Sequence, residues 1–145
     1  MPVFRDAAAL ERHLKKAMDT LQFEVIKATQ AQIGSDAVSP VDTGRFRSSW
    51  FAAEGQASSE VAPEGTNKPN DDAKGLRVDS SKTYHLTNSL PYAVPIALGE
   101  NLPSSWGGEH RVVSKTSTWF TSFRNETIPS IQQTAARVIR KEFDL

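Results

Sequence analysis

The chain contains no cysteine among its 145 residues. This absence excludes disulfides, thiolate catalysis and cysteine-based zinc or iron–sulfur sites, and it makes a reducing cytoplasm acceptable as the compartment. No apolar run approaches the ~20 residues that a membrane-spanning helix needs, and the amino terminus lacks the charged-then-apolar order of a signal peptide. We therefore expect a soluble protein that is made and used without export.

An excess of charge of either sign is also missing. Lysine plus arginine and aspartate plus glutamate both number 17, so the formal net charge is zero. Such a chain has no global basic field to attract nucleic acid or an anionic membrane. A net charge near zero also gives little electrostatic protection against self-association, which indicates an assembled rather than a solitary protein.

Motifs that carry chemistry are scarce. The three histidines, His13, His85 and His110, have no ligand-type spacing and the carboxylates are scattered, so we expect no metal site and no cofactor. The chain also lacks a Walker pattern, a strand-linked Gly-x-Gly-x-x-Gly and a Gly-x-Ser-x-Gly nucleophile elbow. Each histidine is expected to be a surface residue or a satisfied core residue.

One triplet does match a catalytic motif. Asp42-Thr43-Gly44 has the letters of the aspartic-protease triplet, in which two carboxylates share a proton and activate water. In those enzymes the triplet closes a hydrophobic strand and a small residue follows it, whereas here Ser-Pro precedes it and Arg-Phe follows. A hydrolase that uses Asp42 is thus the alternative to a structural turn, in which Asp42 accepts backbone hydrogen bonds and Gly44 frees the backbone.

A minimal basic–aromatic cluster follows this turn. Arg45 and Arg47 stand beside Phe46 and Trp50, which keeps a small nucleic-acid-binding module as a further alternative. The spacing of Phe46 and Trp50 suits a helical turn, while the aromatic content suits a strand, so both remain open for this segment.

Two helices are expected to frame the chain, at 6–33 and 118–142. Asp6 is a suitable cap for the first helix, whose apolar stripe is formed by Leu10, Leu14, Ala17, Leu21, Val25 and Ala28. Phe23 and Ile26 lie off this stripe and need a partner elsewhere in the fold or on a neighbouring subunit. Pro129 either kinks the second helix or makes it restart, with Thr127 as the cap.

The middle of the chain is expected to form strands and loops. Alternation at Tyr84, Leu86 and Asn88 has the period of two that is typical of a half-buried strand, and Pro91 then produces a turn or a bulge. The full set of expected segments is a turn and strand at 40–54, an exposed loop at 55–82, a central strand at 83–99 and a second loop at 100–116. A structureless loop beyond ~15 residues usually binds something or is ordered by a partner.

The fold class expected from these segments is α+β, as a single domain. The long amino-terminal helix and the carboxyl-terminal helix would pack on a small, mostly antiparallel sheet, with long exposed loops. Trp106, in the second loop, is either a plug on the core or a contact for a partner.

This order of elements resembles the neck and minor tail proteins of tailed bacteriophages. The resemblance rests on Pro-Val-Asp-Thr-Gly-Arg-Phe-Arg-Ser-Ser-Trp after the first helix, and on Thr-Asn-Ser-Leu-Pro-Tyr-Ala-Val-Pro-Ile-Ala-Leu-Gly in the central segment. Ala97 stands where that family usually carries a glutamate. The similarity covers about residues 10–138, and its sharpest matches are Pro40, Asp42, Thr43, Gly44, Asn88, Pro91, Tyr92, Ala93 and Gly99.

The resemblance implies a structural virion protein that performs no catalysis. Such a protein is made in the host cytoplasm and joins the filled head to the tail as a ring at the neck, a role known as tail completion. Its partners would be other copies of itself, portal or head-closure proteins, and tail-tube or tail-terminator proteins, with no membrane and no specific nucleic acid. The candidate partner contacts are Phe23, Ile26 and Trp106.

Overall fold

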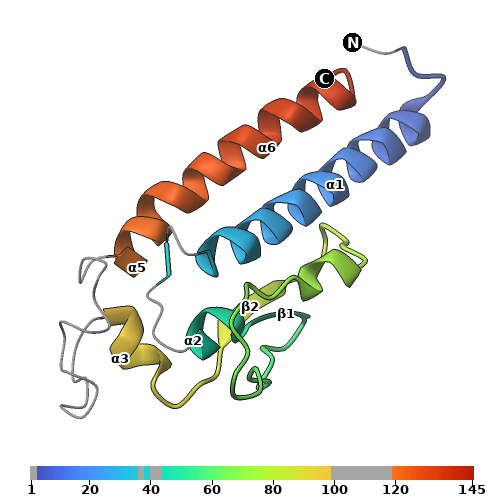
Figure 1. Cartoon of the computed structure of the whole chain (residues 1–145). Coiled ribbons are helices and arrows are strands. Elements are labelled where there is room, and N and C mark those ends of the chain that lie inside the picture. The colour runs from blue at the N-terminus through green and yellow to red at the C-terminus, as the bar shows by residue number, and fades with distance from the viewer. Residues whose placement is uncertain (1–2, 36–37, 40–43, 99–118) are drawn as a thin grey trace.

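The computed structural model describes residues 3–35, 38–39, 44–98 and 119–145. Two long antiparallel helices lie side by side, and a two-stranded antiparallel sheet with short helices lies on the far side of one of them (Figure 1). The predicted α+β class, with a long helix at each end of the chain, is confirmed.

Helix α1 (Ala7–Ile33) begins and ends where the sequence predicts. The Asp6 carboxylate accepts a hydrogen bond of 2.8 Å from the Ala9 N–H, which satisfies a donor that the first turn leaves free. Gly34 follows the last turn and lies so close to the next segment that a Cβ atom there would be 2.9 Å from the Arg47 carbonyl oxygen. The end of α1 is therefore fixed by close packing as well as by propensity.

Of the two alternatives left open for the segment after Gly44, the structure has the one that opens as a helical turn. A short helix, α2 (Arg45–Ser48), leads into strand β1 (Trp50–Glu54). Strand β2 (Tyr84–Asn88) pairs with β1 in antiparallel register, with Trp50 opposite Asn88 and Glu54 opposite Tyr84.

The central strand is much shorter than predicted. It ends at Asn88, and the residues predicted to continue it to Gly99 form helix α3 (Ala93–Leu98) instead. Asn88 already pairs with the first residue of β1, so the described part of the chain leaves no strand to pair with a continuation. The buried Ala93 and Ile96 are three residues apart, and Pro95 falls in the first turn, where its missing N–H costs no helical hydrogen bond.

The predicted exposed loop at 55–82 is also partly buried. It contains a 3₁₀ turn, η1 (Asp72–Gly75), and its alanines Ala62 and Ala73 are fully enclosed. Most of its residues are exposed, as predicted, but the segment is more ordered than a plain loop because polar side chains from α1 and from residues 45–49 bind its backbone, as described below.

The carboxyl-terminal helix passes through Pro129 without a break. It consists of α5 (Trp119–Ser122), a π-helical turn η3 (Phe123–Thr127) and α6 (Ile128–Glu142), which follow one another directly. A π turn is wider than an α turn, and it moves the preceding carbonyls away from the proline ring. The predicted kink or restart is thus replaced by a local widening of the helix.

The core lies where α2, β1, α3 and α5 meet the end of α1. The Phe46 ring packs edge to face against Trp50 and against Trp119, and the Trp119 indole donates a 3.2 Å hydrogen bond to the Ile96 carbonyl. Among the described residues, the buried cluster consists of Ile33, Phe46, Trp50, Leu90, Ala93, Ile96, Trp119 and Phe123.

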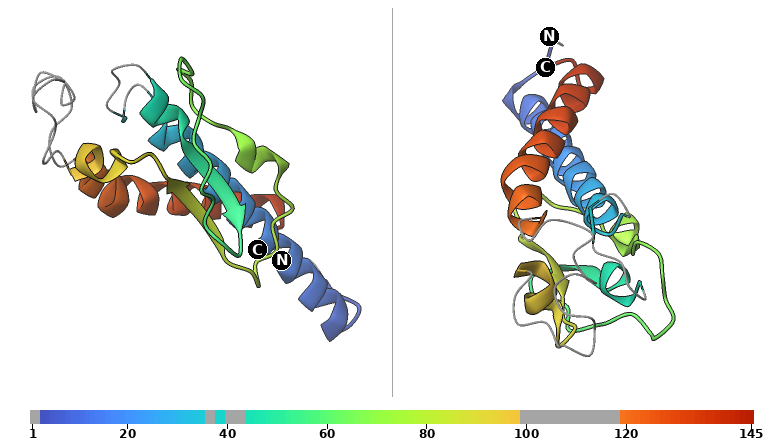
Figure 2. Two further views of the ribbon diagram at one scale, coloured as in Figure 1. Left: turned by 90° about the horizontal axis from the view of Figure 1, so that it is seen from below. Right: turned by 60° about the vertical axis from the view of Figure 1, so that its left-hand side comes forward.

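The far ends of the helix pair are held together by a second contact. His13 Nε2 and the Phe143 carbonyl oxygen are 2.7 Å apart, and the His13 ring packs against Phe4 and Phe143. As Figure 2 shows, the end of α6 lies beside the start of α1. Helix α1 lies between α6 and the sheet layer, and its first turns extend beyond both.

Candidate functional site

The turn before α2 is built around Gly44. Its φ angle is +90°, and a Cβ atom there would lie 2.0 Å from Oδ1 of Asn67. Only glycine fits this close approach without strain. The other three residues of the predicted turn, Pro40, Asp42 and Thr43, lie outside the described residues, so the geometry of the Asp42 carboxylate is not part of the structure.

Helix α2 fastens the 55–82 segment through its polar side chains. The buried Ser48 and Ser49 hydroxyls accept hydrogen bonds from the N–H groups of Lys68 and Ala62, at 2.9 and 3.0 Å. Arg45 Nε donates to the Ala62 carbonyl at 2.8 Å, and Arg47 Nε donates to Asn67 Oδ1 at 2.8 Å. These side chains hold the 55–82 segment against α2.

Because of these contacts, the predicted basic–aromatic cluster is not available on the surface. Phe46 and Trp50 are buried, and Arg45 and Arg47 are engaged by the 55–82 segment. Binding of single-stranded nucleic acid needs exposed rings on which bases can stack. This cluster offers no such platform.

The motif that begins at Asn88 supports the core. The Asn88 side-chain amide donates to the Phe46 carbonyl at 2.8 Å, and its oxygen accepts from the Leu90 N–H at 3.3 Å. Pro91 and Tyr92 form the turn into α3, and Ala93 is buried at its start. Four of the five residues of the predicted strand motif therefore act at a strand-to-helix corner; the fifth, Gly99, lies outside the described residues.

No chemical centre emerges from the described part of the chain. Within it, no group of three or more histidine, aspartate or glutamate side chains could hold a metal ion. His13 and His85 lie on different elements, α1 and β2, and His110 lies outside the described residues. No helix in the described ranges is long and apolar enough to cross a membrane.

Buried Gln30 is a structural residue that the sequence did not single out. Its amide donates to the Trp50 carbonyl at 3.0 Å and to the Asp72 carboxylate, and its oxygen accepts from the Ala73 N–H at 3.0 Å. One side chain of α1 thus holds both β1 and η1. The available signal was a long polar residue on the same helix face as Phe23 and Ile26.

Phe23 and Ile26 are therefore placed inside the fold. They lie seven and four residues before Gln30, which puts all three on the face of α1 that is turned to β1 and η1. Both are half-buried, and Lys27 Nζ lies 5.0 Å from the centre of the Phe23 ring. Of the two partners considered for them, one elsewhere in the fold fits this placement. The third candidate contact, Trp106, lies outside the described residues.

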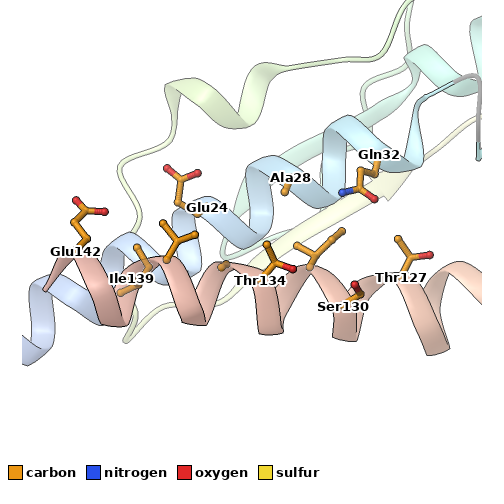
Figure 3. A pocket seen from close by; sticks show the side chains of 11 residues that line it. Glu24, Ala28, Gln32, Thr127, Ser130, Thr134, Ile139 and Glu142 are labelled. Atoms are coloured by element: carbon orange, nitrogen blue, oxygen red, sulfur yellow. The ribbon is translucent and has the colours of Figure 1, made fainter. Parts of the chain in front are cut away.

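The opposite face of α1 carries the predicted apolar stripe, and α6 covers only part of it. On one side of the seam between the two helices is a groove of about 490 Å³. Ala28 lines it from α1, as Figure 3 shows. Ile131, Ala135 and Val138 line it from α6. Glu24 and Glu142 lie at one end of the groove and Gln32 and Thr127 at the other. We call this the groove side of the helix pair.

The other side of the seam has a hollow of about 400 Å³. Its lining is mostly apolar and comes from α1 at Met18, Leu21 and Val25 and from α6 at Ala136. Met18 is 55% exposed, and Leu14, one turn before it, is 40% exposed. We call this the ridge side, after the exposed Leu14 and Met18 that lie along it. Exposed apolar residues gathered along one helix pair are typical of a contact surface.

A network of charges holds the start of this helix pair to the 77–82 segment. Lys15 Nζ lies 2.6 Å from Asp19 Oδ1 and 2.8 Å from Asp79 Oδ1, and Ser80 and Ser81 donate N–H hydrogen bonds to these two carboxylates. The hydrogen bonds from Lys15 and then Ser81 hold the pKa of Asp79 well below its ordinary value of 3.8. Burial opposes the shift at Asp19, but its hydrogen bonds outweigh it and lower the pKa there as well.

We expect this network to make stability depend on acid pH. Because the pKa of Asp79 is lower in the folded state, its contribution is present above the ordinary pKa and is lost as the pH falls toward the folded value. The melting temperature should therefore fall between about pH 5 and pH 2, and Asp79→Asn should make that fall shallower. Asp71→Asn is the control, since the ion pair of Asp71 with Lys74 is local to the 3₁₀ turn and does not reach α1. Equal pH slopes for the wild type and Asp79→Asn would contradict the expectation.

No protein-family model matches this chain, and neither a curated protein nor a solved structure matches it.

Proposed function

We propose that this chain is a structural protein of a tailed-phage virion that assembles as a ring at the head–tail junction. One observation carries the proposal: the α1–α6 pair exposes apolar residues on two opposite sides, at Met18 and at Val138. Each copy thus has two apolar surfaces for neighbours, as a ring subunit requires.

The remaining support comes from residues that the phage neck and minor tail proteins share with this sequence. Gly44, Asn88 and Ala93 have roles in positioning the core: a close backbone approach, a bond to α2, and the buried start of α3. A catalytic residue would instead be expected at a cleft with titratable neighbours. The proposed protein performs no catalysis and takes no cofactor.

The proposed partners are other copies of this chain, portal or head-closure proteins, and tail-tube or tail-terminator proteins. Mixing the purified protein with each of them and following co-elution on size-exclusion chromatography tests this. We expect a complex with at least one partner from the head–tail junction. If the protein elutes unchanged with every one of them, the proposal fails.

Asp42→Asn is a matched variant in the same experiment. Asparagine caps a turn as well as aspartate does, so complex formation should be unchanged. The same substitution removes the carboxylate that an aspartic protease needs. If the wild type cleaved peptides and Asp42→Asn did not, the protein would be a hydrolase.

A further inference from the structure

We propose that copies of this chain join head to tail through the α1–α6 pair, with the ridge side of one copy packed against the groove side of the next. The ridge side consists of Leu14, Met18, Leu21, Val25 and Ala136, and the groove side consists of Ala28, Ile131, Ala135 and Val138. This inference rests on the proposed function, because it names the surface through which the ring would close.

The two sides face in opposite directions from one seam. In α1, Glu24 lines the groove from one edge of the stripe that faces α6, and Met18 and Gln22 line the hollow from the other edge, as 3.6 residues per turn place them. A contact between two different surfaces of the same chain is heterologous, and it closes into a ring when the rotation between copies allows it.

Exposed residues of the ridge side and of the groove side lie at a similar height along the helix pair. Ala136 lines the ridge-side hollow together with Met18, and Val138 follows Ala136 by two residues, or about 3 Å of helix rise. Copies related by an axis parallel to the helix pair would therefore bring Met18 of one to Val138 of the next. Both side chains are more than half exposed, at 55% and 56%.

Charge favours a second copy as the occupant. The acidic end of the groove has Glu24 and Glu142, and Arg140 follows Ala136 by one helical turn, on the ridge side at a similar height. Within the described ranges, neither Arg140 nor Glu142 has an ion pair. Docking ridge to groove at equal height places Arg140 near the two glutamates of the next copy, and the zero net charge of the chain adds no repulsion.

The size of the surface sets how strong one contact is. The 15 residues of α6 extend about 22 Å, so a side two helices wide offers roughly 400 Å², about half of what each partner buries in a standard stable interface. A single contact is then weak. A closed ring gives every copy two contacts, and this is what stabilises the assembly.

Cysteine cross-linking tests this contact, because the chain has no cysteine of its own. Met18→Cys and Val138→Cys are prepared as separate proteins and as a double variant, and each is oxidised under mild conditions at high concentration. We expect no disulfide dimer beyond background from either single variant, dimers from their mixture, and a ladder of larger products from the double variant. Mixing Met18→Cys with Gln133→Cys, at an exposed α6 position outside both lined sides, measures background from random collision.

Two results would overturn the proposal. Dimers from one single variant alone would mean that like sides pair around a two-fold axis. A mixture that cross-links no better than the Gln133→Cys control would mean that these sides do not meet. The cross-linking experiment contains no partner protein. If it fails, the proposed function can still operate through another surface of the chain. If co-elution with every partner fails, the cross-linking result still stands.

Discussion

Replacing Gly44 by alanine is expected to lower the free energy of unfolding by about 3 kcal/mol and the melting temperature by roughly 10 °C. Two costs combine. A backbone at φ +90° is strained for any residue with a Cβ atom, and that atom would lie 2.0 Å from Oδ1 of Asn67. Asn67 would have to move, and with it the hydrogen bond from Arg47 Nε that ties the 55–82 segment to α2.

Gly65→Ala separates the backbone strain from the steric clash with Asn67. Gly65 has a nearly identical φ of +86°, but a Cβ atom there would meet nothing within 4 Å. Its substitution should cost about 1 kcal/mol, the backbone part alone. Thermal and denaturant unfolding of both variants provide the measurement. If the two alanines cost the same, the close approach to Asn67 is not what makes Gly44 necessary.

Replacing Gln30 by methionine is expected to cost about 2–4 kcal/mol, although methionine has a similar length and is apolar. Gln30 is 1% exposed, and its removal leaves the Ala73 N–H and the Trp50 carbonyl without this partner in a buried site. The η1 turn should loosen first, because Gln30 also binds the Asp72 carboxylate. Hydrogen exchange at Ala73 reports that loosening directly.

Gln32→Met is the matched control on the same helix. Gln32 is exposed at the edge of the groove, so the same chemical change there should alter stability by less than about 0.5 kcal/mol. Unchanged exchange at Ala73 in Gln30→Met, or an equal loss of stability in both variants, would show that Gln30 does not hold the segment.

The helices were predictable because their signal is long and local. The stripe from Leu10 to Ala28 runs through most of the 27-residue helix α1, and Asp6 and Gly34 mark the ends of that helix. The alternation at Tyr84–Asn88 likewise predicted β2. In contrast, Ala93–Leu98 is a short apolar run of six residues, for which periodicity cannot separate a strand from a helix, and only the end of β1 decides it.

The order within the 55–82 segment could not be predicted, because it depends on polar residues far away in the sequence. Gln30, Ser48 and Ser49 hold Ala73, Lys68 and Ala62 through single hydrogen bonds, and nothing local in the sequence indicates these partners. The groove side and the ridge side of the helix pair could not be predicted from the sequence for a related reason. The stripe was visible, but how much of it α6 leaves uncovered depends on the packing of two helices about 100 residues apart.

The most direct test of the proposed role is the molar mass of the purified protein in solution, measured by light scattering over a concentration series, alone and with a portal or tail-tube protein. The account predicts a discrete ring-sized species at high concentration, which forms more readily with such a partner and is lost in Met18→Glu. Because Met18 is more than half exposed, this variant should keep its fold, which circular dichroism checks. A protein that stays a single chain at every concentration and ignores every such partner would contradict the account.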